Sequence, residues 1–252
     1  MVDWQRQPGF DLSGKKALVI GCANPAGHAA AVALAEAGAD VAVASATMDG
    51  DEVMAAKRAS KAVANLGCQT LAHGWDVTLP TNVQVSYRQV TKEFGAPDIV
   101  VFNASNRGGR GPITELDPEA IRQAVLISCY GGFLVGQAAA RLMLERGSGT
   151  ILMTGASASY KGYANSSSFA MGKFGLRGLA QSMARELAPR NIHVAHFVID
   201  GGVRAADRPE PADRPDSMLD PAAIAQTYLW VLQQPRSAWT WEVELRPWVE
   251  NF

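Results

Sequence analysis

The feature that most constrains the fold of this chain is its alternation of short aliphatic runs with longer stretches of helical periodicity. Glycine ends several of the helical stretches, and proline begins others. Such alternation predicts a parallel β-sheet with helices on both faces, which is a doubly wound α/β fold. The expected strands are 17–20, 41–44, 69–73, 99–102, 150–154 and 192–199, and the expected helices are a first one ending near 37, then 51–66, 80–94, 118–146, 166–188 and 221–232.

The C-terminal part of the chain departs from this alternation. Trp239, Trp241, Val243 and Leu245 alternate with polar residues, which predicts a seventh strand with one solvent-exposed face. Segment 204–219 is rich in proline and charge and has no period, so we expect a lid-like loop there.

Composition excludes several classes of function. The chain has 23 Lys and Arg against 24 Asp and Glu, so it lacks the positive charge that a nucleic-acid partner requires. Its apolar runs are short and interrupted, and we expect no membrane-spanning segment. The polar stretch Met1–Asp11 predicts no secretory signal, and a cytoplasmic location follows.

Cysteine and histidine patterns indicate neither a disulfide framework nor a metal site. Cys22, Cys68 and Cys129 are odd in number and widely spaced, so we expect reduced, buried thiols. The four histidines lack metal-ligand spacing, and His193 and His196 are interpreted as structural.

A glycine-containing turn, Gly21–Gly27, joins the first expected strand to the first expected helix. In that position, backbone N–H groups and a helix N-terminus can face a pyrophosphate, as in dinucleotide-binding proteins. A tight strand–helix turn without a ligand is the alternative. Pro25 counts against phosphate binding because proline lacks an N–H donor.

Several motifs in order along the chain resemble those of the short-chain dehydrogenase/reductase family, from about Leu12 to Leu245. Gly21 and Gly27 are similar to the outer glycines of the family's Gly-x-x-x-Gly-x-Gly turn. The other landmarks are Trp75–Thr78 for the adenine-binding stretch, Phe102–Ser105 for Asn-Asn-Ala-Gly, Ile151–Ser157 for the serine strand, Phe169–Lys173 for Tyr-x-x-x-Lys, and Asp200–Val203 for Pro-Gly-x-Val.

The resemblance implies a single Rossmann-type domain over residues 1–252, with about seven strands, that transfers a hydride between a nicotinamide cofactor and a small-molecule alcohol or carbonyl substrate. It implies that NAD or NADP contacts a set of residues at the strand ends. These are Gly21, Asn24, Gly27, Ser45, Asp76, Val77, Asn103, Ala104, Lys173 and Val203.

The chain departs from the family at three of the four catalytic positions. Phe169 stands at the tyrosine position and lacks the hydroxyl acid, and Ser128 stands at the asparagine position. Ala156 stands at the serine position, with Ser157 one residue later, so only Lys173 is kept. Loss of a positioned general acid typically costs about 10²–10⁴-fold in rate. The resemblance therefore supports the cofactor-binding fold better than the usual catalysis.

Each of these residues also has a structural interpretation. Lys173 lies among small apolar residues, and burial beside a cofactor ribose competes with a surface position. Phe169 borders the site or fills core. Tyr160 or Tyr163 replaces the missing acid or packs on the surface, and Ser157 or Ser159 orients substrate or forms a turn. Asp76 binds adenine or caps a turn.

Cofactor choice stays open in the sequence. An acidic residue after the second strand favours NAD and an arginine favours NADP, but the chain reads Ala44-Ser45-Ala46-Thr47 there. Tyr130, Tyr160, Tyr163 and Phe169 lead us to expect an apolar or aromatic substrate pocket.

Three functions compete. They are an oxidoreductase with an atypical active site, a non-redox lyase or hydrolase, and a non-catalytic nucleotide-binding protein. In the family, the two long helices pack against a second subunit, so 118–146 and 166–188, with Gly172, Gly175 and Gly178, predict a homodimer or homotetramer.

Overall fold

A seven-stranded parallel sheet in the order β3-β2-β1-β4-β5-β6-β7 organises the computed structural model, which describes residues 10–250. The predicted doubly wound fold with seven strands is confirmed. The strands are β1 Lys16–Ile20, β2 Asp40–Ala44, β3 Thr70–His73, β4 Ile99–Phe102, β5 Gly149–Thr154, β6 Ile192–Ile199 and β7 Glu242–Leu245. The polar segment 1–9, where the sequence predicts no secretory signal, lies outside the described residues.

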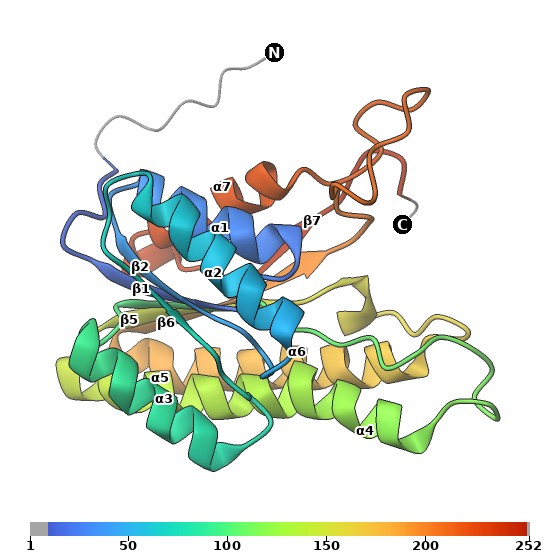
Figure 1. The fold of residues 1–252 in the computed structure, drawn as a ribbon, viewed down its shortest axis with the longest axis horizontal. Helices are drawn as coiled ribbons and strands as arrows, with labels where there is room; N and C mark the ends of the chain where they lie inside the picture. The colour runs from blue at the N-terminus through green and yellow to red at the C-terminus, as the bar shows by residue number, and fades with distance from the viewer. Residues whose placement is uncertain (1–9, 251–252) are drawn as a thin grey trace.

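Helices cover both faces of the sheet, with α1, α2 and α7 on one side and α3, α5 and α6 on the other (Figure 1). The central strands are therefore buried on both faces, and all eight residues of β6 are buried. The helices are α1 Pro25–Glu36, α2 Gly50–Ala64, α3 Pro80–Glu93, α4 Pro118–Val125, α5 Gly131–Arg146, α6 Ser167–Leu187 and α7 Pro221–Leu232. Short 3₁₀ helices lie at Ser157–Ser159, Ala188–Arg190 and Arg236–Ala238.

The strand order reverses at β1, which pairs with β2 on one side and with β4 on the other. The loops that follow β1 and β4 consequently run to opposite faces and leave a crevice between them. In open parallel sheets, ligands bind in this crevice at the carboxyl ends of the strands.

The predicted helix 118–146 is continuous but contains a π-helical turn, Leu126–Tyr130, between α4 and α5. Hydrophobic periodicity did not indicate this turn. By length and composition alone this helix could cross a membrane. Half of its most apolar window is buried inside the protein, as in the core helix of an α/β domain.

The C-terminal part differs from the prediction in where its strand begins and in the contacts at the ends of segment 204–219. β7 begins only at Glu242, and Trp239 before it stacks on His193, with 4.6 Å between the ring centres. Segment 204–219 is closed at its base by a bridge between Val203 and Leu219, and it projects from the sheet beside the C-terminus (Figure 1). Its role as a lid stays a prediction.

The three cysteines are free, and Cys22 is buried. The expectation of burial was wrong for Cys68 and Cys129, which are half-buried.

Candidate functional site

The glycine turn after β1 is built so closely that side chains are excluded from it. Gly21 has a φ of +88°, and a Cβ there would lie 2.6 Å from the backbone nitrogen of Ala104. A Cβ on Gly27 would lie 2.3 Å from the carbonyl oxygen of Gly21. Both positions therefore require glycine, because the first turn of α1 packs directly on the ends of β1 and β4.

Two asparagines hold this turn. Asn24 caps α1 by accepting a hydrogen bond from the Gly27 N–H at 3.1 Å. The Asn103 side-chain NH₂ donates to the Gly21 carbonyl at 2.7 Å and to Asn24 Oδ1 at 2.8 Å. Asn103 is fully buried, and its Oδ1 has no hydrogen-bond partner among the described residues. A buried acceptor of this kind is costly unless a ligand satisfies it.

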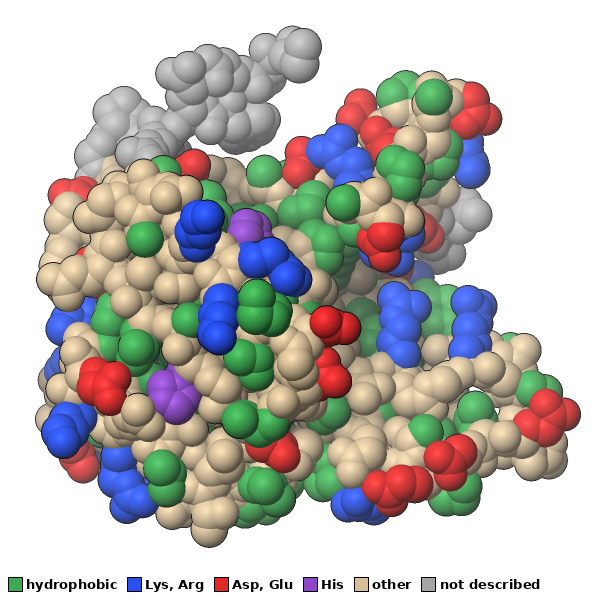
Figure 2. Space-filling view, in the orientation of Figure 1, with side chains coloured by type: hydrophobic (Ala, Val, Ile, Leu, Met, Phe, Trp, Pro, Cys, Tyr) green, Lys and Arg blue, Asp and Glu red, His purple; other side chains and the backbone are tan. Residues whose placement is uncertain are grey.

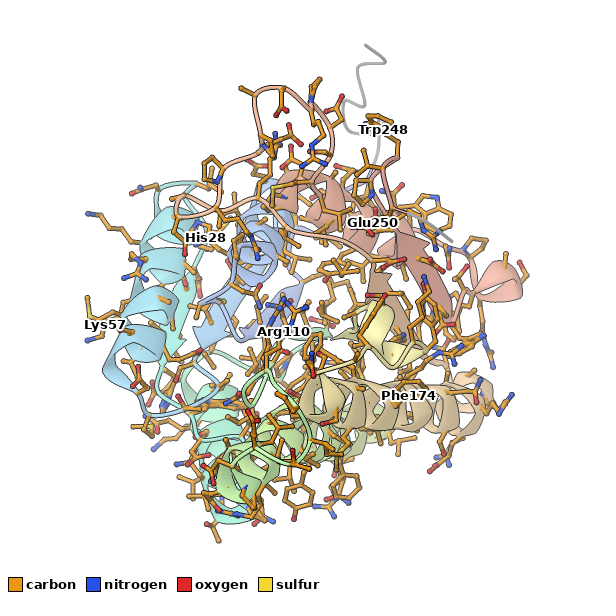
Figure 3. All side chains as sticks on the ribbon, turned by 90° about the vertical axis from the view of Figure 1, so that its right-hand side faces the viewer. His28, Lys57, Arg110, Phe174, Trp248 and Glu250 are labelled. Carbon is orange, nitrogen blue, oxygen red and sulfur yellow. The ribbon has the colours of Figure 1, made fainter. Side chains whose placement is uncertain are left out.

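A main cavity of about 580 Å³ lies at the carboxyl ends of β1, β4, β5 and β6. Figure 2 shows the molecule hollowed on this side, below the projecting C-terminal loop, with Lys and Arg side chains along the lower wall. Figure 3 looks into it and places Arg110 near the centre, with Glu250 above. Of the residues expected at the site, the main cavity is lined by Asn24, Asn103, Ser157, Tyr163, Phe169, Lys173 and Val203.

A small cavity of about 200 Å³ adjoins the main one, and both are lined by Asn24, Asn103 and Ser105. Gly21, Ala23, Ala46, Glu52 and Ala104 complete its walls. The two cavities therefore share a wall at the ends of β1 and β4.

Lys173 lies at the bottom of the main cavity and is only 2% exposed. Its Nζ donates to the carbonyl oxygen of Thr154 at 2.7 Å. Burial, with a smaller contribution from the nearby Arg107 charge, lowers the pKa of Lys173 to about 7. The surface alternative for this lysine is thereby excluded.

Phe169 borders the cavity rather than filling the core. The Arg107 guanidinium lies 5.1 Å from the centre of its ring, and the Lys173 ammonium lies 5.9 Å from the same point. Both are within cation–π range. Tyr163 also lines the cavity and is 46% exposed, whereas the Tyr160 hydroxyl, outside the lining, donates to Asp200 and Glu244.

Ser128, which was expected at the family's asparagine position, lines neither cavity. It is fully buried in the π-helical turn, and its Oγ accepts from the Asn106 N–H at 2.9 Å and donates to the Asn106 carbonyl at 3.2 Å. Its side chain therefore holds the segment that follows β4.

Four expected cofactor residues also lie outside the cavity linings, namely Gly27, Ser45, Asp76 and Val77. The Ser45 Oγ accepts from the Trp75 N–H at 3.0 Å, within the core. Asp76 Oδ1 accepts from the backbone and hydroxyl of Thr78 at 2.9 and 2.6 Å, which is the turn-capping alternative. Val77 is fully buried.

The expected aromatic lining is borne out for Tyr163 and Phe169 but not for the other two residues. Tyr130 and Tyr160 do not line the main cavity, whereas Arg107, Arg110 and Arg208 do. The run Arg107-Gly-Gly-Arg110-Gly was a usable signal in the sequence, because arginines in a glycine-rich loop at a strand end can reach a ligand.

Glu52, which lines the small cavity, was also missed. It belongs to the first turn of α2, and its carboxylate accepts from the Ala46 N–H at 3.4 Å. The sequence analysis considered only the residues directly after the second strand, whereas the acidic group reaches the same place from the next helix.

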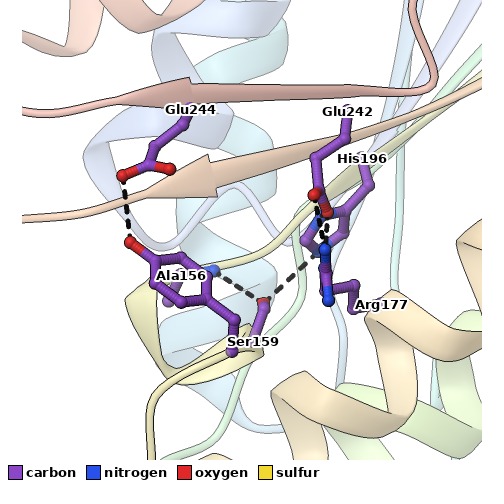
Figure 4. A network of polar contacts seen from close by, with 7 residues as sticks. Ala156, Ser159, Arg177, His196, Glu242 and Glu244 are labelled. Atoms are coloured by element: carbon purple, nitrogen blue, oxygen red, sulfur yellow. Dashed lines mark hydrogen bonds and ion pairs between the residues drawn. The ribbon is translucent and has the colours of Figure 1, made fainter.

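Behind the site, a buried polar network connects the 155–160 segment to α6 and β7 (Figure 4). The Ser159 Oγ contacts His196 Nε2 at 3.3 Å, and Glu242 contacts His196 Nδ1 at 3.0 Å. Arg177 donates twice to Glu242, at 2.6 and 2.7 Å. Burial lowers the pKa of His196 to about 4, which keeps the ring neutral near pH 7.

Although serine, histidine and glutamate follow one another in this network as in a hydrolase triad, Ser159 is fully buried and outside the cavity lining. Its hydroxyl also accepts from the Ala156 N–H at 3.1 Å. The network therefore fixes the backbone that presents Ser157, in agreement with the structural interpretation of His196.

Comparison with known proteins identifies the family. Residues 15–208 match the family model for short chain dehydrogenases. The chain is 34% identical over 186 residues to cis-4-hydroxycyclohexanecarboxylate dehydrogenase of Sinomonas cyclohexanicum, covering 74% of this chain and 72% of that protein. It is 32% identical over 185 residues to D-threitol dehydrogenase of Mycolicibacterium smegmatis, covering 73% and 69%.

Solved structures agree. A short-chain dehydrogenase from Rhodopseudomonas palustris superposes with a TM-score of 0.77 at 33% identity, covering 93% of this chain and 99% of that one. A short-chain type dehydrogenase/reductase from Mycobacterium marinum gives 0.82 at 30%, covering 94% and 96%. The chain therefore belongs to the short-chain dehydrogenase/reductase family of oxidoreductases.

Proposed function

We propose that this protein binds NAD(H) and interconverts an alcohol and a carbonyl group in an active site that lacks the family's tyrosine. The observation that carries the proposal is the placement of Lys173, which is buried in the cavity that adjoins the glycine turn. A buried lysine without a carboxylate partner is rare in structural positions. The names of the relatives, which are dehydrogenases of hydroxylated small molecules, support the same reaction class.

The residues present fit a dinucleotide. Gly21 and Gly27 leave no side chain at the turn, and the unpartnered Asn103 Oδ1 offers an acceptor beside it. Ala104, which lines the small cavity, and Val203, which lines the main cavity, would contact the cofactor. When bound, the nicotinamide ring supplies a donor or acceptor of hydride. Ser45, Asp76 and Val77 would support this site from behind rather than line it.

Glu52 supports NAD(H) over NADP(H). Its carboxylate lines the small cavity together with the glycine turn and Ala46, where the adenosine ribose of a dinucleotide belongs. A carboxylate there can accept from ribose hydroxyls, and it repels the additional phosphate of NADP(H).

Lys173 would hold and transfer the proton at its Nζ. With a pKa of about 7, its ammonium and amine forms are both populated near neutral pH, which suits a general acid and base. Ser157 and Tyr163, which line the same cavity, would orient the substrate oxygen. Ser128 would act indirectly by positioning the segment after β4.

Titration calorimetry with NADH and NADPH tests this proposal. We expect NADH to bind more tightly, and E52Q to narrow the preference by roughly tenfold, since one like-charge contact is removed. D51N, in the same helical turn but outside the cavity lining, should change neither affinity. If neither nucleotide binds, the proposal fails and a non-redox enzyme remains. If NADH binds but no carbonyl substrate causes its absorbance to fall, a non-catalytic nucleotide-binding protein is favoured.

We also propose a homodimer or homotetramer, consistent with the family. The large apolar side chains Tyr130, Phe133, Met171 and Phe174 are exposed on the helices expected at the interface. Sedimentation equilibrium will give the number of subunits.

The free cysteines accord with the cytoplasmic location that the sequence predicts.

A further inference from the structure

Two arginines line the substrate side of the main cavity without an acidic partner. Arg107 and Arg110 belong to the segment between β4 and α4, and both guanidinium groups are exposed to the cavity. No carboxylate of residues 10–250 lies within ion-pair distance of either group. The contact found for the Arg107 guanidinium is the face of the Phe169 ring.

Positive charge accumulates here. The ammonium of Lys173 and the guanidinium of Arg107 both lie within 6 Å of the centre of the Phe169 ring, and Arg107 contributes to the lowered pKa of Lys173. Grouping cations in a partly enclosed space is unfavourable unless an anion joins them. The positive charges on this wall, which have no acidic partner among residues 10–250, therefore indicate a negatively charged ligand.

The opposite wall limits how much negative charge fits. Asp200 and Glu250 line the same cavity. Asp200 is neutralised by Lys161 at 3.6 Å and Arg246 at 3.4 Å, and Arg208 is occupied by hydrogen bonds to the Val203 carbonyl. The carboxylates on this wall would repel a phosphate dianion more strongly than a carboxylate monoanion.

The arginine segment is held in place by two serines. The Ser128 Oγ bonds the backbone N–H and carbonyl of Asn106, and the Ser168 Oγ donates to the carbonyls of Arg107 and Gly109. These contacts fix the backbone on both sides of Arg107, so the guanidinium is presented without a large cost in chain entropy. Ser128, expected at the position of the family's relay asparagine, thus holds the arginine segment instead.

We propose that Arg107 and Arg110 bind the carboxylate of a small hydroxy- or keto-acid, which makes an organic monoanion the substrate class of this site. The planar guanidinium pairs with a carboxylate through two parallel hydrogen bonds. With the carboxylate held there, the reacting oxygen of the acid would face Lys173 and Ser157. The inference rests on the proposed function for its reaction, but not for its binding step.

Benzoate and benzamide are a matched pair of probes, equal in shape and different in charge. By titration calorimetry on the NADH-saturated protein, we expect benzoate to bind more tightly than benzamide. R107Q and R110Q should each weaken benzoate binding by about 10- to 100-fold and leave benzamide binding unchanged. R190Q, exposed on the 3₁₀ helix Ala188–Arg190, is the matched control and should change nothing.

Several results would overturn the inference. These are equal affinity for the two probes, tighter binding of phenyl phosphate than of benzoate, and a loss of NADH affinity in R107Q that equals the loss of benzoate affinity. The last result would assign the arginines to the cofactor phosphates. If R107Q fails to fold, R110Q and the wild-type probe pair still decide the question.

The test separates the two proposals. If no nicotinamide nucleotide binds the wild-type protein, the proposed function fails, and titration of benzoate and benzamide into the cofactor-free protein still decides the carboxylate site.

Discussion

The two halves of the crevice differ in how strongly the backbone constrains them. On the side of β1 and β4, a single Cβ added to the glycine turn would collide with backbone. On the side of β5 and α6, the cavity is lined by side chains, among them Phe169 and Lys173. Backbone packing that tolerates no side chain is hard to alter, whereas side-chain chemistry on a fixed backbone can be replaced.

The side of β5 and α6, which we call the reaction side, is arranged around a cation. The Arg107 guanidinium lies over the Phe169 ring, and Ser128 holds the backbone of the arginine segment. We propose that the chain departs from its family mainly on this side of the crevice.

The largest expected effect tests whether the reaction side lacks only a hydroxyl. F169Y should raise kcat for carbonyl reduction by about 10²–10⁴-fold, since it restores a positioned proton donor one helical turn from Lys173. The rate is read from NADH absorbance with a keto-acid substrate. F174Y, on the exposed face of the same helix, is the control. An unchanged rate in F169Y would mean that the site lacks more for carbonyl reduction than a hydroxyl group at position 169.

A smaller effect concerns the buried network behind the reaction side. The folded-state pKa of His196, about 4, lies below its unfolded value of 6.5, so the unfolded chain binds the proton more readily. Its contribution to stability is therefore complete above pH 6.5 and is lost as the pH falls toward 4, by up to about 3 kcal/mol.

Urea unfolding at pH 7.5 and pH 5 measures this loss. The decrease in unfolding free energy should be smaller in H196N, which cannot titrate, than in the wild type. H73N, at the other edge of the sheet, should keep the wild-type decrease. An equal decrease in H196N and wild type would contradict the assignment.

The smallest effect concerns the cost of keeping Lys173 in the crevice. Its folded-state pKa, about 7, lies below the unfolded 10.5, so burial penalises the folded state fully below pH 7 and ceases to do so above pH 10.5. K173M removes this penalty but leaves the Thr154 carbonyl without its donor. The net gain at pH 7 should be about 2 kcal/mol in unfolding free energy.

This gain should disappear near pH 10.5, whereas reductase activity should be lost at every pH. K57M, on the exposed face of α2 (Figure 3), is the control and should leave stability unchanged. A K173M protein that is less stable than wild type at pH 7 would show that the lysine contributes more as a packing group than it costs as a charge.

Most of the fold was predictable from the sequence because aliphatic runs and helix caps are local signals. Asp117–Pro118 and Asp220–Pro221, for example, begin helices as the cap rules require. The π-helical turn was not predictable, since one extra residue per turn changes the periodicity too little to be read.

The site was predictable only in part. Lys173, Phe169 and the glycine turn could be placed by their motifs, because each motif fixes a backbone position. Ser45 and Asp76, expected as ligand contacts, accept hydrogen bonds from nearby backbone N–H groups, which short polar side chains do as readily as they bond a ligand. Glu52 was missed because it enters the crevice from a helix that carries no motif of its own, whereas Arg107 was missed although its glycine-rich loop offered a signal.

The single amide of Asn103 has a wider consequence. It borders both cavities and also bonds the turn that closes one of them. A substitution at this position would therefore disturb both cavities at once. Other lining residues could be exchanged with an effect on one cavity alone, whereas a change at Asn103 would alter the two together.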